Sequence, residues 1–404
     1  MYKIRVSFKQ KDLNVFEKLR NYSSSKNDNI SKNLKLKKCL VFSKFSRYDY
    51  ERYFLSKSPQ NDLEFEKKVR SKGLNYDRLV EYKTMNSKFE EKVTNCLKEL
   101  GIEVQVVNRL SCNTKLIEWA DIIIPTGGDG TFLLAASQIT DNKKIIVGFN
   151  SDPNHSEGHL CLPKKFSVNI KEAIKNLQTG NFRWLMRSRI RTKLTAQTFG
   201  KPVDLHRMNN DNLLKFNPEN GTEVTLPVLA LNEVFVGESL SAKASTLDIN
   251  LDDSSVFTRI KSSGVCITTG TGSTSWYYSM NRLAPDYISI LLRLLKSKID
   301  NPELLENNNS LCSELADIYN KSLIFNADDK RMAYTVRDMI VAGVWPSPKG
   351  IQPRNFAKKV RLQSLCYDAG LVIDGNISFP FNNNAKATFE IHDEDALRTV
   401  IMDP

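Results

Sequence analysis

The chain lacks paired cysteines, long apolar runs and internal repeats, and it contains little histidine. Its seven cysteines are scattered singly without a Cys-x-x-Cys motif, so neither a disulfide framework nor a zinc site is expected. His155 and His159 are four residues apart, but Pro153 and Gly158 interrupt that region and further ligands are missing. No stretch approaches the roughly 18 apolar residues of a membrane span. These absences favour a globular intracellular protein with reduced thiols and no metal held by side chains.

The formal net charge of +12 is unevenly distributed along the 404 residues. Residues 1–38 contain eleven basic and three acidic side chains, which leaves a charge of only +4 for the other 366 residues. A basic groove across the folded part would need a larger excess there, with aromatic residues interleaved. The sequence therefore predicts no nucleic-acid partner and no membrane partner.

The basic N-terminal segment has features of a mitochondrial presequence. Residues 1–22 carry apolar Leu13, Phe16 and Leu19 near helical spacing, and the end of the segment resembles a processing site with cleavage after Tyr22. Its two acidic residues leave a disordered basic tail as the alternative. Residues 23–37, rich in Ser, Asn and Lys, are interpreted as a linker. The first interpretation places the mature protein in the mitochondrial matrix.

Residues 38–180 have the rhythm of an open parallel α/β sheet of Rossmann-like type. Short apolar runs predict buried strands, and three- and four-residue spacing of apolar residues predicts helices. The expected strands are 39–42, 102–107, 120–124 and 145–149, and the expected helices are 76–100 and 131–139. Helices between parallel strands are typical of this fold class.

Residues 181–384 predict a second, β-rich domain with antiparallel strands. Apolar and polar residues alternate in several short segments, which is the pattern of half-buried strands. These segments are residues 189–195, 228–236, 247–251, 265–269 and 371–374. Helical patterns at 288–295 and 311–324 mark an insertion at 284–345. Residues 385–404 are predicted to return to the first domain, with a strand at 387–391 and a helix at 394–401.

The segment Gly127-Gly128-Asp129-Gly130-Thr131 follows a predicted buried strand and precedes a helix. Glycines allow backbone N–H groups to approach phosphate oxygens, and a helix N-terminus favours negative charge. A single carboxylate there can orient or deprotonate a hydroxyl group, or help to hold magnesium. The alternative is a structural turn in which Asp129 caps the helix. The segment is neither a Walker A loop nor a G-x-G-x-x-G motif.

Three further segments carry polar groups at the ends of predicted strands. Asn232-Glu233 interrupts an apolar strand, so one of the two side chains must face either the core or a ligand. Residues 268–276 place six hydroxyl side chains and two glycines before Trp276, which suits phosphate, ribose and base contacts. Asp374-Gly375 ends a strand. Taken singly, each segment also fits an ordinary strand end, surface loop or turn.

In order and spacing these segments together resemble the NAD kinase family. The family's Gly-Gly-Asp-Gly-Thr, Gly-x-Asn, Asn-Glu, Thr-rich and Asp-Gly motifs match residues 127–131, 148–150, 232–233, 269–276 and 374–375. Longer matches at 151–163, 182–191, 230–241 and 393–400 resemble its mitochondrial branch. The chain departs from the family pattern at Gly270 (family proline), Trp276 (family tyrosine) and Ser263-Gly264 (family Asp-Gly), which puts that family Asp's contact with the dinucleotide in doubt.

The resemblance implies transfer of the terminal phosphate of ATP to the 2′-hydroxyl of the adenosine ribose of NAD. It implies a two-domain fold, Mg²⁺ or another divalent cation, and a homodimer. Asp129 is then the catalytic residue. The implied substrate-binding residues are Gly128, Gly130, Thr131, Asn150, Asn232, Glu233, Thr271, Ser273, Thr274, Ser275, Trp276, Ser279 and Asp374. Among these, Asn232 and Glu233 would hold the nicotinamide-side ribose, and residues 274–276 would line the adenine side.

Two other functions remain open at this point. A lipid kinase of the sphingosine or diacylglycerol type shares the Gly-Gly-Asp-Gly-Thr turn but lacks the Asn-Glu pair and the Thr-rich motif. An NAD-binding regulator with weak turnover would keep the fold, although retention of Asp129 disfavours it.

Overall fold

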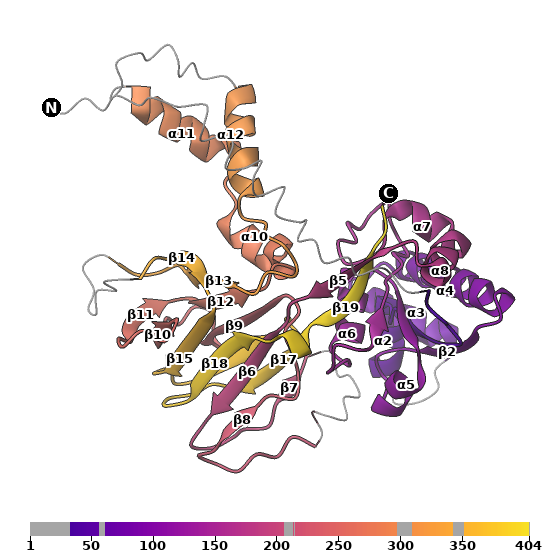
Figure 1. The fold of residues 1–404 in the computed structure, drawn as a ribbon, viewed down its shortest axis with the longest axis horizontal. Helices are drawn as coiled ribbons and strands as arrows, with labels where there is room; N and C mark the ends of the chain where they lie inside the picture. Colours follow the sequence, from indigo (N-terminus) through magenta and orange to yellow (C-terminus); the bar gives the residue numbers. More distant parts are fainter. Residues whose placement is uncertain are drawn as a thin grey trace.

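The computed structural model describes residues 33–55, 61–205, 213, 215–296, 309–341 and 351–403. It has two domains, with an α/β domain at one end and a domain of antiparallel sheets at the other (Figure 1). The predicted presequence at 1–22 and most of the linker lie outside the described residues. The predicted fold class, an open Rossmann-like sheet followed by a β-rich domain, is confirmed.

The first domain is built on a six-stranded sheet in the order β2-β1-β3-β4-β19-β5. The first four of these strands run parallel, and β5 pairs antiparallel with β19. Ile122, Ile123 and Ile124 are fully buried, as expected for a strand covered on both faces. The bounds are β1 Lys38–Ser43, β2 Glu103–Val107, β3 Ile122–Thr126, β4 Ile145–Ile146, β5 Arg183–Arg187 and β19 Leu397–Ile401.

Helices cover both faces of this sheet (Figure 1). Val93 and Leu97 of α4 share one core with Ile124, and Phe132 of α6 shares the opposite core with Ile123. The predicted helices at 76–100 and 131–139 correspond to α4 and α6, whereas α2, α3, α5, α7 and α8 are not predicted from the sequence. The bounds are α2 Arg47–Leu55, α3 Asp62–Ser71, α4 Tyr76–Glu99, α5 Thr114–Trp119, α6 Asp129–Ala136, α7 Lys164–Val168 and α8 Ile170–Thr179.

The second domain packs two antiparallel sheets around one core. The sheet orders are β11-β10-β15-β18-β6-β8 and β14-β13-β12-β9-β16-β17-β7. Leu247 and Ile249 of the first sheet share the core with Val236 and Val265 of the second. The bounds are β6 Ile190–Thr195, β7 Val203–Asp204, β8 Glu223–Thr225, β9 Glu233–Glu238, β10 Ser245–Leu251, β11 Thr258–Ser262, β12 Gly264–Thr268, β13 Met332–Arg337, β14 Arg354–Ala357, β15 Lys359–Ser364, β16 Ala369–Ile373, β17 Ile377–Pro380 and β18 Lys386–Ile391.

The strand pairing differs from the sequence-based boundaries at both ends of the second domain. Strand β5 lies in the first sheet although it follows residue 180, and β18 lies in an antiparallel sheet although it follows residue 385. The helix predicted at 394–401 is wrong. A 3₁₀ turn at Asp393–Asp395 leads into β19, whose Leu397 is buried between β4 and β5. The strand predicted at 228–236 begins only at Glu233.

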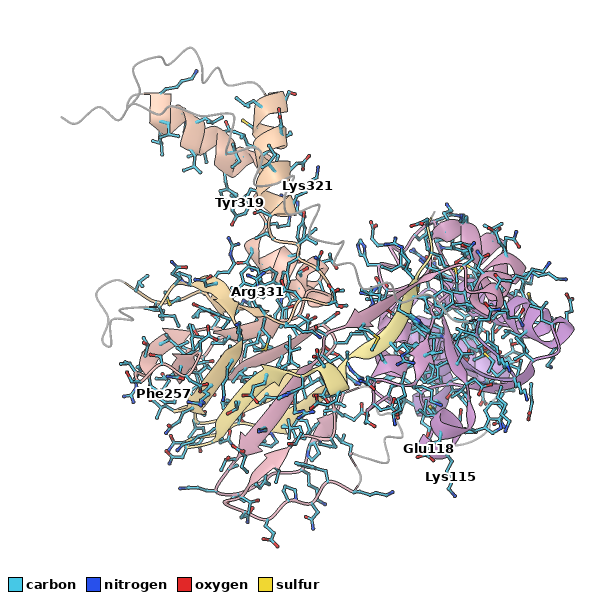
Figure 2. The ribbon with its side chains drawn as sticks, viewed as in Figure 1. Lys115, Glu118, Phe257, Tyr319, Lys321 and Arg331 are labelled. Carbon is cyan, nitrogen blue, oxygen red and sulfur yellow. The ribbon has the colours of Figure 1, made fainter. Side chains whose placement is uncertain are left out.

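The insertion forms a helical hairpin that projects from the body (Figure 1). Helix α11, Pro285–Lys296, packs against α12, Asn309–Lys321, mainly through Ile288, Leu292 and Ala316. Tyr319 lies near the end of α12 that faces the β-rich domain (Figure 2), where its hydroxyl accepts a hydrogen bond from Arg354 at 3.0 Å. Among the described helices, none combines the length and apolarity that crossing a membrane requires.

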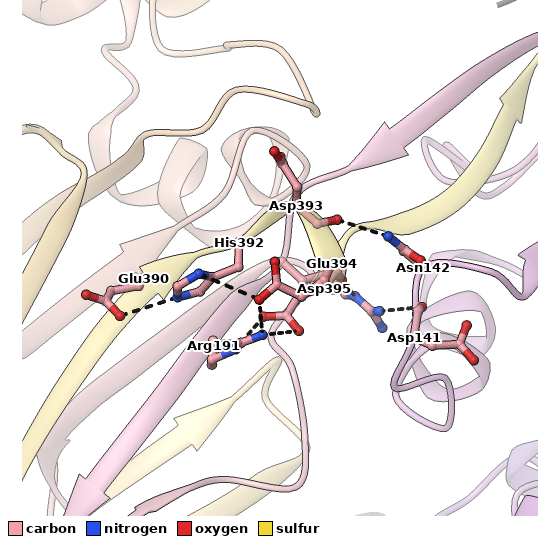
Figure 3. A network of polar contacts seen from close by, with 9 residues as sticks. Asp141, Asn142, Arg191, Glu390, His392, Asp393, Glu394 and Asp395 are labelled. Atoms are coloured by element: carbon pink, nitrogen blue, oxygen red, sulfur yellow. Dashed lines mark hydrogen bonds and ion pairs between the residues drawn. The ribbon is translucent and has the colours of Figure 1, made fainter.

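A buried arginine links the two domains by hydrogen bonds. Arg189 of the segment between β5 and β6 is 1% exposed, and its guanidinium donates to three backbone carbonyls. These belong to Ile139 and Asp141 after α6 and to Asp395 before β19. Figure 3 shows the surrounding junction, where Arg191 pairs with Asp395 and the side chain of Asn142 reaches the backbone of Asp393. The C-terminal side of α6 is therefore fixed to the second domain.

Replacing Arg189 with methionine is expected to destabilise the protein more than the same change at Arg183. The first change strands three buried carbonyls, at about 1–3 kcal/mol each. Arg183 pairs with Asp403 on the surface, where the two side chains are 65% and 82% exposed, and such pairs contribute about 0–1 kcal/mol. Chemical denaturation of R189M and R183M measures both losses. Equal losses would show that the three carbonyl contacts do not hold the junction.

Candidate functional site

The turn at residues 127–131 connects β3 to α6 with very little free space. A Cβ atom at Gly127 would lie 2.4 Å from the hydroxyl oxygen of Thr131, so only glycine fits there. A Cβ atom at Gly130 would meet nothing within 4 Å, because that position faces a pocket. The N–H of Thr131 donates to the carbonyl of Gly128 at 2.9 Å, whereas the N–H groups of residues 128–130 have no hydrogen-bond partner among the described residues. These three N–H groups belong to residues that line the pocket.

The carboxylate of Asp129 is held by the loop that follows β4. The backbone N–H groups of His159 and Leu160 donate to its two oxygens at 3.1 and 2.8 Å. Gly128, not Asp129, occupies the N-cap position of α6, so the capping alternative does not describe this turn. Asn150 orders the same loop by donating to the carbonyl of Ser156 at 3.1 Å. Backbone N–H groups thus orient Asp129, and no ion pair to it occurs among the described residues.

Arg187 lies at the end of β5, between the Asp129 turn and the Thr-rich segment. Its guanidinium donates to the hydroxyl of Thr271 at 3.3 Å, and its Nε has no hydrogen-bond partner among the described residues. Burial lowers the pKa of Arg187 to about 10, against the raising effect of the Asp129 charge, so the side chain stays protonated at neutral pH. No sequence motif singles out Arg187, although it lies in the stretch at 182–191 that resembles the mitochondrial branch.

Asp374 fixes the backbone of the Asn-Glu pair. Its carboxylate accepts hydrogen bonds from the N–H groups of Leu231 at 2.8 Å, Asn232 at 2.8 Å and Glu233 at 3.1 Å. Asp374 itself has a positive φ of 48° and sits in the turn after β16. The three bonds occupy its oxygens, so the geometry gives it a positioning role toward residues 231–233.

Glu233 is a buried carboxyl group without a protein partner for one oxygen. It is 7% exposed, and its Oε2 has no hydrogen-bond partner in the described part of the chain. Burial raises the pKa of Glu233 to about 8, with a smaller contribution from the charge of Asp374. Neighbouring Asn232 is equally buried and points its amide at the hydroxyl of Ser275, 3.4 Å away. This pair is available to a ligand that offers hydroxyl groups.

The hydroxyl groups of the Thr-rich segment have different surroundings. Thr271 contacts Arg187, and Ser275 contacts Asn232. Ser273 is fully buried; its hydroxyl donates to the Gly270 carbonyl at 2.6 Å and accepts from the Phe325 N–H at 3.2 Å, so it is used within the protein. Thr274 and Ser279 bond to backbone carbonyls of their own segment. Only part of the predicted set faces the other motifs.

Trp276 is 36% exposed and lines a different pocket from Asp129. Its ring packs on Phe235 with centroids 4.8 Å apart, and the Arg337 guanidinium is 5.9 Å away. Trp276 and Ser279 line a pocket of about 430 Å³ that also contains Arg337. Ser263, which replaces the family Asp, bonds through its N–H to the Arg337 carbonyl at 2.9 Å, and its hydroxyl has no hydrogen bond within the described part of the chain.

Two pockets meet at the Asp129 turn. One, of about 440 Å³, is lined by residues 128–131 together with Lys44, Arg109 and Ser156. The other, of about 100 Å³, lies between α6 and the second domain, where Gly130 faces Asp374. The Gly-Gly-Asp-Gly-Thr turn of the first domain and the Asp-Gly turn of the second therefore lie on opposite walls of the smaller pocket, and we call the two pockets together the crevice.

The single carboxylate of the larger pocket fits a divalent cation that is carried by substrate phosphates. Within the described residues no group of three His, Cys, Asp or Glu side chains could hold a metal ion. Asp129 is the one carboxylate among the residues that line its pocket. Mg²⁺ is commonly bound by one or two carboxylates plus substrate phosphates and waters, so this donor set fits it.

Comparisons with known proteins identify relatives over almost the whole chain. It is 38% identical over 379 residues to "NAD kinase 2, mitochondrial" of Rattus norvegicus, which covers 90% of this chain and 87% of that protein. It is 37% identical to the protein of the same name from Homo sapiens, covering 90% and 84%. The solved structure of yeast NADH kinase complexed with NADH shares the fold, with a TM-score of 0.50 at 12% identity over 91% of this chain and 84% of that one. No family model matches the chain.

Glu233→Gln is expected to stabilise the protein in alkaline solution. The folded pKa of about 8 exceeds the ordinary value of 4.5, so the parent loses stability as pH rises from 4.5 through 8. Thermal denaturation should show a melting temperature a few degrees above the parent at pH 8.5, and no difference near pH 4.5.

The matched control is Glu238→Gln at the other end of β9. Although burial alone would raise the pKa of Glu238, the N–H of Tyr367, the Lys243 ammonium group and the N–H of Asp368 lower it. This substitution should reduce stability at pH 8.5. If both variants shift in the same direction, Glu233 does not carry an uncompensated charge.

Proposed function

The chain belongs to the NAD kinase family, and from that premise we propose that it transfers phosphate in the crevice beside Asp129. The terminal phosphate of ATP passes to the 2′-hydroxyl of the adenosine ribose of NAD, giving NADP and ADP. The observation that carries this proposal is the carboxylate of Asp129 at the N-terminus of α6, which backbone N–H groups orient and which has no ion-pair partner among the described residues. The lipid-kinase alternative is set aside, since the relatives that span the chain are NAD kinases.

Asp129 accepts the proton of the attacking hydroxyl group. One N–H group fixes each carboxylate oxygen and leaves further lone pairs for the substrate. As the bond from the 2′-oxygen to phosphorus forms, the O–H bond breaks toward Asp129 and the bond between phosphorus and the leaving ADP oxygen breaks. Positioning and charge neutralisation supply most of the acceleration in such transfers.

The charge that develops on the transferred phosphate faces two kinds of donor. They are the backbone N–H groups of residues 128–130 at the N-terminus of α6, and the Arg187 guanidinium, whose Nε is unpaired among the described residues. A divalent cation that accompanies ATP supplies additional charge neutralisation when it is bound, with Asp129 as the nearby carboxylate.

The second domain supplies the NAD-binding subsite. Asn232 and Glu233 offer an amide and a carboxyl group to the hydroxyls of one ribose, and Asp374 holds their backbone in place. Ser275 and the exposed face of Trp276 line the adenine side, with Thr271, Thr274 and Ser279 nearby. Ser273 and Asn150 support the turns that carry these contacts.

The proposal extends to location and assembly. Residues 1–22 would direct the chain to the mitochondrial matrix, in keeping with relatives named mitochondrial NAD kinase. A fluorescent protein fused to residues 1–40 should enter mitochondria, and a cytosolic signal would argue against a presequence. The family resemblance suggests a homodimer, which sedimentation velocity would distinguish from a monomer.

Asp129→Asn is expected to abolish most NADP formation while the fold stays intact. Loss of a general base typically costs about 10²–10⁴ in rate. Purified protein is incubated with NAD, ATP and Mg²⁺, and NADP is measured with a dehydrogenase. The matched control is Asp121→Asn, since Asp121 also accepts two backbone N–H groups, from Lys37 and Lys38, outside the crevice. If the unsubstituted protein forms no NADP with any phosphate donor, the kinase proposal is wrong and an NAD-binding regulator is the remaining function. If D129N keeps a near-normal kcat, Asp129 is not the general base.

Arg187→Met is expected to lower kcat about hundredfold, the usual loss when a donor to developing charge is removed. Arg187→Lys keeps the charge but not the paired donors, so it should recover part of kcat. KM for NAD should change little in either variant. Arg183→Met, on the same strand but on the surface, is the control for the assay. Should R187M keep parental kcat, Arg187 would serve only to support Thr271.

A further inference from the structure

A second buried arginine of the first domain has unpaired donors at a pocket wall. Arg109 follows β2 and is 7% exposed, and its Nε and Nη2 have no hydrogen-bond partner among the described residues. No ion pair to it occurs in the described part of the chain. An unpaired buried guanidinium is costly, because each stranded donor loses its water without gaining an acceptor.

Aromatic rings hold Arg109 in place without using its donors. The guanidinium carbon lies 4.5 Å from the ring centre of Phe45 and 5.5 Å from that of Tyr50. Such contacts favour the cation and fix its plane, but they leave the N–H edges free. Burial lowers the pKa of Arg109, whereas Tyr50 and Asp204 raise it. The side chain is a preorganised cation.

The sheet topology brings Arg109 to the same edge as the Asp129 turn. Strand β1 pairs with β2 on one side and with β3 on the other, all parallel, so the three carboxyl ends lie together. After these ends come Lys44, Arg109 and residues 128–131, and all of them line the pocket of about 440 Å³. Lys44 has no ion-pair partner among the described residues. Two cations and the N-terminus of α6 thus face one space.

We propose that Arg109 and Lys44 form a subsite for the phosphate chain of the donor, on the side of Asp129 remote from the NAD ribose. This inference rests on the proposed function and adds two binding residues and a ligand class to it. The ligand class is an oligophosphate, which the subsite recognises by its negative charge and its oxygen acceptors. A guanidinium edge binds two phosphate oxygens at once, and the α6 N-terminus receives a third anionic group. ATP and inorganic polyphosphate share this chemistry.

The lining favours a phosphate chain over a nucleobase as the group that Arg109 contacts. The two aromatic rings nearest the guanidinium are engaged with it, and the free edge offers donors only. A base would need both donors and acceptors at its edge, whereas phosphate oxygens are acceptors alone. The acidic Asp129 in the same pocket stays available to the acceptor hydroxyl because its own oxygens are fixed by backbone N–H groups.

Binding and kinetics of Arg109→Met, Arg109→Lys and Lys44→Met test the subsite. Calorimetric titration without NAD uses three probes: inorganic tripolyphosphate, ATP and adenosine. We expect tripolyphosphate and ATP to bind the parent and to bind R109M at least tenfold more weakly, as lost charged hydrogen bonds require. KM for ATP should rise by a similar factor while KM for NAD stays within twofold. R109K should recover part of the affinity. K44M should weaken the binding of tripolyphosphate and of ATP, and this substitution does not remove a packed side chain.

Arg398→Met is the control for lost cation–π packing, since Arg398 lies 5.3 Å from the Trp184 ring centre outside this pocket. Unchanged tripolyphosphate and ATP affinities in both R109M and K44M would overturn the subsite. Adenosine binding that falls with R109M would overturn the assignment to phosphate. If R109M forms NADP with a parental KM for ATP, the subsite proposal is wrong and the proposed function stands. If the parent forms no NADP but binds tripolyphosphate in a way that depends on Arg109, the proposed function is wrong and the subsite stands.

Discussion

The site depends on one constraint: backbone N–H groups hold two of its carboxylates, those of Asp129 and Asp374, and no ion pair to either occurs among the described residues. Asp129 receives the N–H groups of His159 and Leu160, and Asp374 receives those of residues 231–233. Backbone donors fix an anion in direction without neutralising its charge. The charges of Asp129, Arg187 and Arg109 therefore remain available to substrates. In an ordinary core the same groups would pair with one another.

This arrangement lowers stability locally, and the rest of the fold compensates for it. Glu233 and Asp374 have pKa values raised to about 8 and about 6, because burial disfavours their charged forms. The surrounding structure is correspondingly rigid. Strands β3, β9 and β12 are almost wholly buried, and Arg189 fixes the segment after α6 to β19 by three carbonyl contacts. Because α6 begins at Asp129, the same contacts set the position of the carboxylate.

The sequence predicted those parts of the fold in which local pattern and tertiary packing agree. The buried strand β3 is a continuous apolar run, helix α4 has apolar residues at three- and four-residue spacing, and the turn at residues 127–131 contains three glycines. Prediction from the sequence failed where the pairing of a segment with neighbouring strands decides its structure. Residues Leu397–Ile401 carry apolar side chains that fit a helix or a strand, and only the open edges of β4 and β5 select the strand. Arg187 and Arg109 escaped because single arginines carry no motif. Their significance comes from burial and unpaired nitrogens, which a linear sequence does not show.

The insertion reaches the site through its returning segment. A Cβ atom at Gly270 would lie 1.7 Å from the carbonyl oxygen of Asn326, so the proline typical of the family cannot occupy this position. The next carbonyl, that of Ala327, accepts the N–H of Ser188 at 2.8 Å, one residue after Arg187. The segment after α12 thus packs on the Thr-rich turn and on the end of β5 together. Gly270 is explained by this packing, which makes the departure from the family pattern a consequence of the insertion and not a loss of the site.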